Sequence, residues 1–229
     1  MKGMLVVIEG TDGSGKKTQT ELLRERMETQ GLPVASLSFP QYGKKSAGLV
    51  EEYLRGAYGE ACDVSPRVSS LFYALDRYDG SFAIRALLES DIHVVLDRYV
   101  DSNAGHQGGK ITNEEERVQF LKWLYEIEYD ILKCPKPDLV VVLHLPAEES
   151  QRRIQARALQ NNTGALDIHE GDLDHLSHAE KTYLWTVERN PLSHRLVECV
   201  ENDRELTREE IHEKIWGLVN PLLTARSSS

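Results

Sequence analysis

The sequence IEGTDGSGKKT, residues 8–18, decides the fold because it places three glycines and two lysines directly after a hydrophobic run. Glycines let the backbone close tightly, so that successive N–H groups face phosphate oxygens at the start of a helix. An ordinary glycine-rich turn is the alternative, but the stretch lies between a predicted strand and a predicted helix, as a phosphate-binding loop requires. The pattern G-x-x-x-x-G-K therefore predicts a phosphate-binding loop (P-loop) that contains Gly10, Gly13, Ser14, Gly15 and Lys16.

The residue after the P-loop lysine departs from the usual pattern. Most P-loops carry a serine or threonine there, whose hydroxyl binds Mg²⁺. Lys17 occupies the position and Thr18 follows it, and both are expected near ATP. One residue along a helix turns the side chain by about 100°, so Thr18 does not automatically supply the missing hydroxyl. Asp97, at the end of a later predicted strand, is the leading candidate for the Mg²⁺ ligand.

Short apolar runs alternate with longer amphipathic segments along the whole chain. This alternation is typical of βα units around a parallel sheet. The predicted strands are 4–9, 34–39, 93–97, 139–145 and 195–200, and the predicted helices are 16–30, 67–89, 113–132, 148–160, 172–189 and 207–223. We predict an α/β fold of the three-layer P-loop NTPase type, with a five-stranded parallel sheet. It forms one domain over residues 1–224, followed by a disordered tail at 225–229.

Composition limits the partners and the compartment. The net charge of −10 disfavours nucleic acids and anionic membranes, which bind to broad positive surfaces. No apolar run has the length of a membrane helix, and the N-terminal one is too short for a signal peptide. The three cysteines form no CxxC pair, which argues against disulfides and zinc. We expect a cytoplasmic protein.

Three predicted strands end in chemically active residues. The first runs into the P-loop, the second into residues 39–42 and the third into residues 97–99. Because the carboxyl ends of parallel strands meet at one edge, a single binding cleft is predicted there.

Several further motifs together resemble one family. They are LDRY at 96–99, YALDR at 73–77, FPQYG at 39–43, SNAGHQGG at 102–109 and PDLVVVL at 137–143. Their order and spacing with the P-loop resemble the thymidylate kinases, from Leu5 to about residue 218. The resemblance implies Mg²⁺-dependent transfer of the ATP γ-phosphoryl to dTMP, giving dTDP and ADP in dTTP synthesis, and it implies a homodimer.

The resemblance also implies which residues bind the base. Arg77 matches the arginine that donates to the thymine O4, and an aromatic ring stacks on the base. Either Phe72 or Tyr73 supplies that ring. Asn103 and Gln107 are expected to read the base edge. An ion pair on the helix surface, with Asp76 or Asp79, is the alternative role for the arginine.

Other residues match positions around the sugar, the phosphates and the metal. Asp12 is expected to hold the 3′-hydroxyl, and His106 lies near the sugar; a turn-forming aspartate and an exposed histidine are the alternatives. Arg98 is expected to bridge the two nucleotides' phosphates while Asp97 orients Mg²⁺, although the two could form a structural ion pair. The nucleotide pocket is further shaped by Phe39 and Pro40.

A mobile lid is predicted at about residues 150–171. Phosphoryl transfer needs cations around the transferred group, and this P-loop has no arginine. Arg153 and Arg157 lie four residues apart and can share one helix face, so either could be the catalytic arginine. A solvated basic surface is the alternative role for these arginines.

At the level of function, a deoxynucleoside kinase and a non-catalytic P-loop switch are the alternatives to thymidylate kinase.

Overall fold

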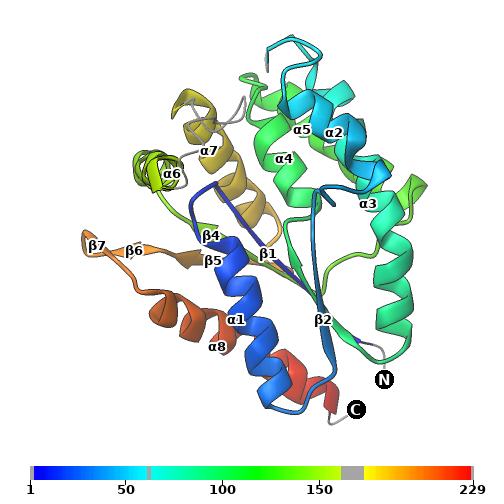
Figure 1. The fold of residues 1–229 in the computed structure, drawn as a ribbon, viewed down its shortest axis with the longest axis vertical. Helices are drawn as coiled ribbons and strands as arrows, with labels where there is room; N and C mark the ends of the chain where they lie inside the picture. Colours follow the sequence, from blue (N-terminus) through cyan, green and yellow to red (C-terminus); the bar gives the residue numbers. More distant parts are fainter. Residues whose placement is uncertain (1–2, 61–62, 161–172, 228–229) are drawn as a thin grey trace.

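The computed structural model of the chain describes residues 3–60, 63–160 and 173–227. Its centre is a parallel sheet of five strands in the order β2-β3-β1-β4-β5 (Figure 1). The strands are β1 (Leu5–Gly10), β2 (Val34–Ser38), β3 (His93–Asp97), β4 (Leu139–His144) and β5 (His194–Glu198). The predicted five-stranded parallel sheet is confirmed.

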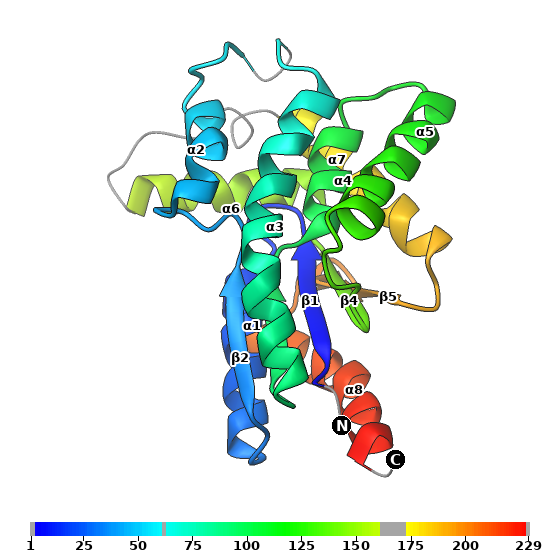
Figure 2. The same ribbon diagram turned by 90° about the vertical axis from the view of Figure 1, so that its right-hand side faces the viewer.

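Helices cover both faces of the sheet, as Figures 1 and 2 show. They are α1 (Lys16–Thr29), the 3₁₀ helix η1 (Lys45–Ala47), α2 (Gly48–Leu54), α3 (Pro66–Glu89), α4 (Val100–Gly108), α5 (Glu114–Tyr125), the π-helix η2 (Glu126–Ile131), α6 (Ala147–Gln160), α7 (Leu173–Arg189) and α8 (Arg208–Ser227). A small antiparallel hairpin pairs β6 (Val200–Glu201) with β7 (Arg204–Glu205).

The central strand β1 is buried on both faces because its side chains alternate between two cores. Val6 and Ile8 pack in the core that includes residues of α1 and α8. Leu5 and Val7 pack in the opposite core, with residues of α3, α4, α5 and α7. The three-layer arrangement therefore follows directly from the continuous apolar run before the P-loop.

The C-terminal boundary differs from the prediction. Helix α8 runs to Ser227, so the disordered tail predicted at 225–229 is wrong for residues 225–227. Arg226 stabilises this last turn because it donates to the carbonyl oxygen of Gly3 at 3.2 Å and pairs with Asp138. Of the predicted lid, residues 150–160 belong to α6, and the remainder lies outside the described residues.

Strand register brings the predicted cleft residues together. Ile8 of β1 lies beside Asp97 of β3, so the P-loop and the Asp97-Arg98 pair leave the sheet side by side.

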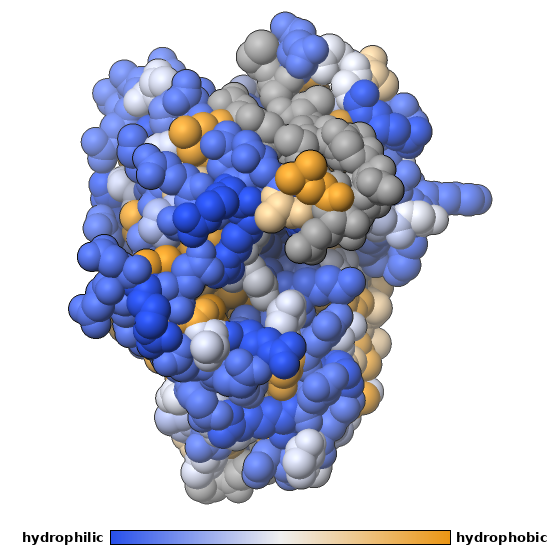
Figure 3. Space-filling view, turned by 60° about the vertical axis from the view of Figure 1, so that its left-hand side comes forward, coloured by the Kyte–Doolittle hydropathy of each residue, from blue (hydrophilic) through white to orange (hydrophobic). Residues whose placement is uncertain are grey.

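The face of the molecule in Figure 3 is mainly hydrophilic, with hydrophobic residues in small groups. In the described part of the chain, no helix is long and apolar enough to cross a bilayer.

Candidate active site

The loop after β1 has the backbone conformation of a P-loop. Gly10 and Gly13 have φ angles of 135° and 78°, which only glycine adopts readily. A Cβ atom on Gly10 would lie 2.3 Å from the carbonyl oxygen of Leu143, so the loop also needs a small residue where it passes β4. The loop opens α1 at Lys16, whose Nζ donates to the carbonyl oxygen of Thr11 at 2.7 Å.

The environment of Lys16 shifts its titration towards neutral pH. Burial, followed by repulsion from Arg98, lowers the pKa of the Lys16 ammonium to about 8, although nearby carboxylates act in the opposite direction. The charge that attracts phosphate is therefore partly lost in mildly alkaline solution.

We expect this shift to appear in nucleotide binding. ADP affinity of the free protein should fall as pH rises above the Lys16 pKa of about 8, by about tenfold per pH unit at the limit. Titration calorimetry from about pH 6.5 to about pH 9.5 measures the effect. Lys16→Met should bind ADP weakly at every pH without this decline. An equal decline in the variant would contradict the assignment.

The helix after the P-loop presents a different hydroxyl from the one considered above. Thr18 is exposed and is not among the residues that line a pocket at the carboxyl edge of the sheet, whereas Lys17 and Thr20 both line it. Thr20 is buried and its hydroxyl has no hydrogen-bond partner among the described residues. The Oδ1 atom of Asp97, a residue that lines the same pocket, is unpartnered in the same way.

Arg98 is the central cation of the pocket. Its φ of 66° is unusual for a residue with a side chain and turns the chain sharply after β3. The guanidinium pairs with Asp12 of the P-loop and lies 3.4 Å from both Ser102 Oγ and His106 Nε2. Burial would raise the pKa of the Asp12 carboxyl, but Arg98 and Lys16 outweigh it and hold the pKa below its usual range.

Glu9 organises this end of the pocket, and sequence reasoning missed it. The fully buried carboxylate accepts from the backbone N–H groups of Tyr99 and Ser102 at 2.7 and 2.9 Å. Tyr183 of α7 donates to its other oxygen at 3.3 Å. Burial raises the pKa of Glu9. By binding N–H groups at the start of α4, Glu9 fixes the helix that carries Asn103, His106 and Gln107.

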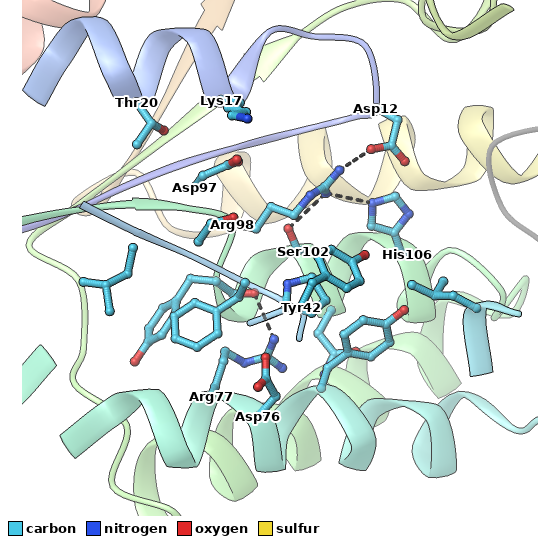
Figure 4. A pocket seen from close by; sticks show the side chains of 18 of the residues that line it. Asp12, Lys17, Thr20, Tyr42, Asp76, Arg77, Asp97, Arg98, Ser102 and His106 are labelled. Carbon is cyan, nitrogen blue, oxygen red and sulfur yellow. Dashed lines mark hydrogen bonds and ion pairs between the residues drawn. The ribbon is translucent and has the colours of Figure 1, made fainter. Parts of the chain in front are cut away.

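The pocket itself encloses about 560 Å³ at the carboxyl edge of the sheet. Figure 4 shows Arg98, Asp12 and His106 on one side and Arg77 on the other, with Tyr42 between them. The predicted site residues that line it are Asp12, Lys17, Phe39, Pro40, Tyr73, Arg77, Asp97, Arg98, Asn103, His106, Gln107 and Arg157. Of the two aromatic candidates, Tyr73 lines the pocket, whereas Phe72 packs against Tyr53 and Tyr58.

Arg77 is buried and does not form the surface ion pair considered above. Its Nε donates to Glu128 Oε1 at 2.9 Å, its Nη2 pairs with the same oxygen, and its Nη1 donates to the carbonyl oxygen of Tyr99 at 3.3 Å. Asp76 instead accepts from the backbone of Gln41 at 2.8 Å and holds the loop after β2. Arg77 is thus held by groups of the protein interior while it also lines the pocket.

Two amides of α4 complete this side. Asn103 donates through Nδ2 to the carbonyl oxygen of Ser70 at 3.1 Å, while its buried Oδ1 has no partner among the described residues. Gln107 Oε1 accepts from Ser69 Oγ at 2.7 Å. His106 stacks on His175 of α7, with ring centroids 5.5 Å apart.

The structure separates the two lid arginines. Arg157 lines the pocket. Arg153 donates to the carbonyl oxygen of Gly13 at 3.1 Å and to Glu205 at 2.8 Å, so it ties α6 to the P-loop and to the β6-β7 hairpin. Arg152 also pairs with Glu205, at 2.9 Å.

Comparisons with known proteins agree with this geometry. The family model described as thymidylate kinase matches residues 8–212. The thymidylate kinase of Mycobacterium tuberculosis strain H37Rv is 36% identical over 172 residues, 75% of this chain and 79% of that protein. A probable thymidylate kinase of Thermococcus gammatolerans is 31% identical over 221 residues, covering 95% and 96%. The structure of thymidylate kinase from Candida albicans superposes with a TM-score of 0.70 at 22% identity, covering 96% of this chain and 92% of that one.

A P-loop at a helix N-terminus, facing arginines across a pocket at the carboxyl edge of a parallel sheet, defines a P-loop phosphotransferase. Within that class, the chain belongs to the thymidylate kinase family, because both the family model and the relatives cover most of its length.

Proposed function

We propose that the protein transfers the γ-phosphoryl group of ATP to dTMP, giving dTDP and ADP, as a step of dTTP synthesis. The observation that carries this is that Arg77 and Asn103 line the same pocket. Arg77 has N–H donors held in place by Glu128, and Asn103 has an Oδ1 acceptor with no partner among the described residues. Thymine presents an acceptor at C4 next to a donor at N3, which complements that arrangement. Cytosine presents the opposite pattern at both positions.

The other side of the pocket suits phosphate. Lys16, Arg98 and Arg157 supply positive charge around the P-loop, and Asp12 keeps Arg98 in place. In phosphoryl transfer, fixed cations stabilise the charge that spreads over the transferred group, and little covalent chemistry is required of the protein. Arg98 bridges the acceptor and donor phosphates, while Tyr73 packs against the base and Asp12 or His106 contacts the sugar.

The residues near Asp97 fit a hydrated Mg²⁺ ion. Its unpartnered Oδ1 is the type of ligand that Mg²⁺ prefers, and the Thr20 hydroxyl can accept or donate to a metal-bound water. When bound, Mg²⁺ neutralises charge on the ATP phosphates. Asp97 and Thr20 would orient it, whereas Lys17 adds a positive charge in place of a hydroxyl ligand.

An acceptor panel tests the proposed function. With ATP and Mg²⁺ we expect turnover of dTMP and dUMP, and at least about 100-fold lower kcat/KM for dCMP, measured by coupled ADP release. Thymidine, which lacks the phosphate that Arg98 binds, should not be an acceptor. Turnover of thymidine in preference to dTMP would indicate a deoxynucleoside kinase, and nucleotide binding without any turnover would indicate a switch.

We further infer a homodimer in which α3 packs against a second copy. Along α3, hydrophobic side chains spaced three or four residues apart form one exposed face, which consists of Val68, Leu71, Leu75, Tyr78 and Phe82. Figure 2 shows α3 along the outside of the molecule. Contiguous exposed apolar surface of this kind marks interaction sites.

The free cysteines Cys134 and Cys199 are buried, which suits the reducing cytoplasm.

Sedimentation tests the dimer. The wild-type protein should sediment at about twice the chain mass of 25.9 kDa, and the double variant Leu75→Glu/Phe82→Glu should sediment as a monomer, because two buried carboxylates would oppose association. Leu192→Glu, at a site 94% exposed elsewhere, is the matched control and should remain dimeric. A monomeric wild-type protein would refute the inference.

A further inference from the structure

Glu128 lies behind the base-reading arginine rather than in the pocket. Its side chain is fully buried, and it is not among the lining residues, whereas Arg77 is. One carboxylate oxygen, Oε1, accepts from Arg77 Nε at 2.9 Å and also pairs with Nη2. The second oxygen has no hydrogen-bond partner among the described residues, and both side-chain nitrogens that the carboxylate binds belong to Arg77. The Cys134 thiol also interacts with Glu128, and burial, followed by this carboxylate, raises the pKa of the thiol.

The hydrogen bonds between Arg77 and Glu128 determine which N–H groups of the arginine remain for a ligand. A guanidinium has five N–H groups in a rigid plane. Within the described residues, the hydrogen bonds of Arg77 to Glu128 and to the Tyr99 carbonyl use one N–H group on each of its three nitrogens. One donor on Nη1 and one on Nη2 therefore remain, and the carboxylate fixes their direction because both Nε and Nη2 are held.

The backbone around Glu128 is also specialised. The residue belongs to the π-helix η2, which continues α5 with a wider turn. Its carbonyl oxygen accepts from the N–H of Cys134 at 2.9 Å, which anchors the segment that leads to β4. π-Helical turns are uncommon and are often found at functional sites. Here the turn carries the carboxylate that reaches Arg77, 51 residues earlier in the chain.

We propose that Glu128 is a positioning residue that sets discrimination between pyrimidine nucleotides with a carbonyl at C4 and those with an amino group there. This proposal rests on the proposed function. A C4 carbonyl accepts from the fixed donors of Arg77, whereas a C4 amino group places donors against donors. Without Glu128, the arginine side chain can turn away, so the favoured nucleotide loses a contact and the disfavoured one loses a repulsion.

The ratio of kcat/KM values for dTMP and dCMP tests the proposal. In Glu128→Gln this ratio should fall at least about tenfold, equivalent to about 1.4 kcal/mol. The ratio for dTMP and dUMP should stay within about twofold, because both carry the C4 carbonyl. Both ratios are measured on one preparation, so a reduced folded fraction cancels and a general structural effect leaves them unchanged.

Two controls locate the effect. Glu126→Gln makes the same change at an exposed position of the same π-helix, and it should preserve both ratios. Arg77→Ala should lower the dTMP to dCMP ratio, and adding Glu128→Gln to it should lower the ratio no further. An unchanged ratio in Glu128→Gln, or a further fall in the double variant, would overturn the proposed role of Glu128 but not the proposed function. A wild-type protein that does not phosphorylate dTMP would overturn the proposed function as well.

Discussion

Replacing Arg98 with alanine should lower kcat/KM for dTMP by about 100-fold to 1,000-fold, the effect of removing one preorganised group that stabilises charge in a transition state. Arg98 meets that description because Asp12 and the strained backbone hold its guanidinium at the mouth of the P-loop. Steady-state kinetics with a coupled ADP assay measures the effect. ADP affinity should change much less than turnover, since Lys16 and the loop backbone still bind the nucleotide.

Arg98→Lys is the matched control for this prediction. The lysine keeps the positive charge but lacks the planar fork that can contact two phosphates, so activity should lie between those of the wild type and Arg98→Ala. Turnover of Arg98→Ala within a few-fold of the wild type would exclude a role in transition-state stabilisation and would favour a purely structural ion pair with Asp12.

The second large effect distinguishes two arginines on α6. Arg157→Ala should lower kcat for dTMP phosphorylation by at least about 100-fold, because this side chain lines the pocket in which the proposed function places the phosphates of both nucleotides. Arg153→Ala should lower it by less than about tenfold, because that guanidinium is bound to Gly13 and Glu205 and acts on the P-loop only indirectly.

The neighbouring Arg152 provides the control for both α6 variants. It forms exposed ion pairs with Glu149 and Glu205, and such pairs contribute little to the free energy of unfolding. Arg152→Ala should therefore retain nearly full activity and thermal stability. The opposite order, with Arg153→Ala more severely impaired than Arg157→Ala, would contradict the assignment of Arg157 and would favour Arg153 as the catalytic arginine.

The sequence predicted the sheet and the P-loop because their signals are local. β1 is a continuous apolar run, its glycines are adjacent in the chain, and α1 follows at once. The predicted helices do not include α4, whose glycines weaken helix propensity. The structure explains one of them, because a Cβ atom on Gly105 would lie 2.6 Å from the Tyr183 ring. Close packing of α4 on α7 requires that glycine despite its cost.

The supporting carboxylates could not be predicted from one sequence. Glu9 reaches the start of α4, 93 residues away, and Glu128 reaches Arg77, 51 residues away. No spacing rule relates residues so distant, and only the folded sheet and the π-helix bring them together. The sequence also does not show which of the two lid arginines lines the pocket, because residues four apart share a helix face. Only the different neighbours of Arg153 and Arg157 in the structure distinguish them.

The most direct test is a crystal structure with dTMP and ADP bound together. The proposed function predicts that the thymine base lies against Tyr73, with its C4 oxygen at Arg77 and its N3–H directed at Asn103 Oδ1. The phosphate of dTMP should contact Arg98. A nucleotide bound in the reverse orientation, or a base that contacts neither Arg77 nor Asn103, would contradict the account.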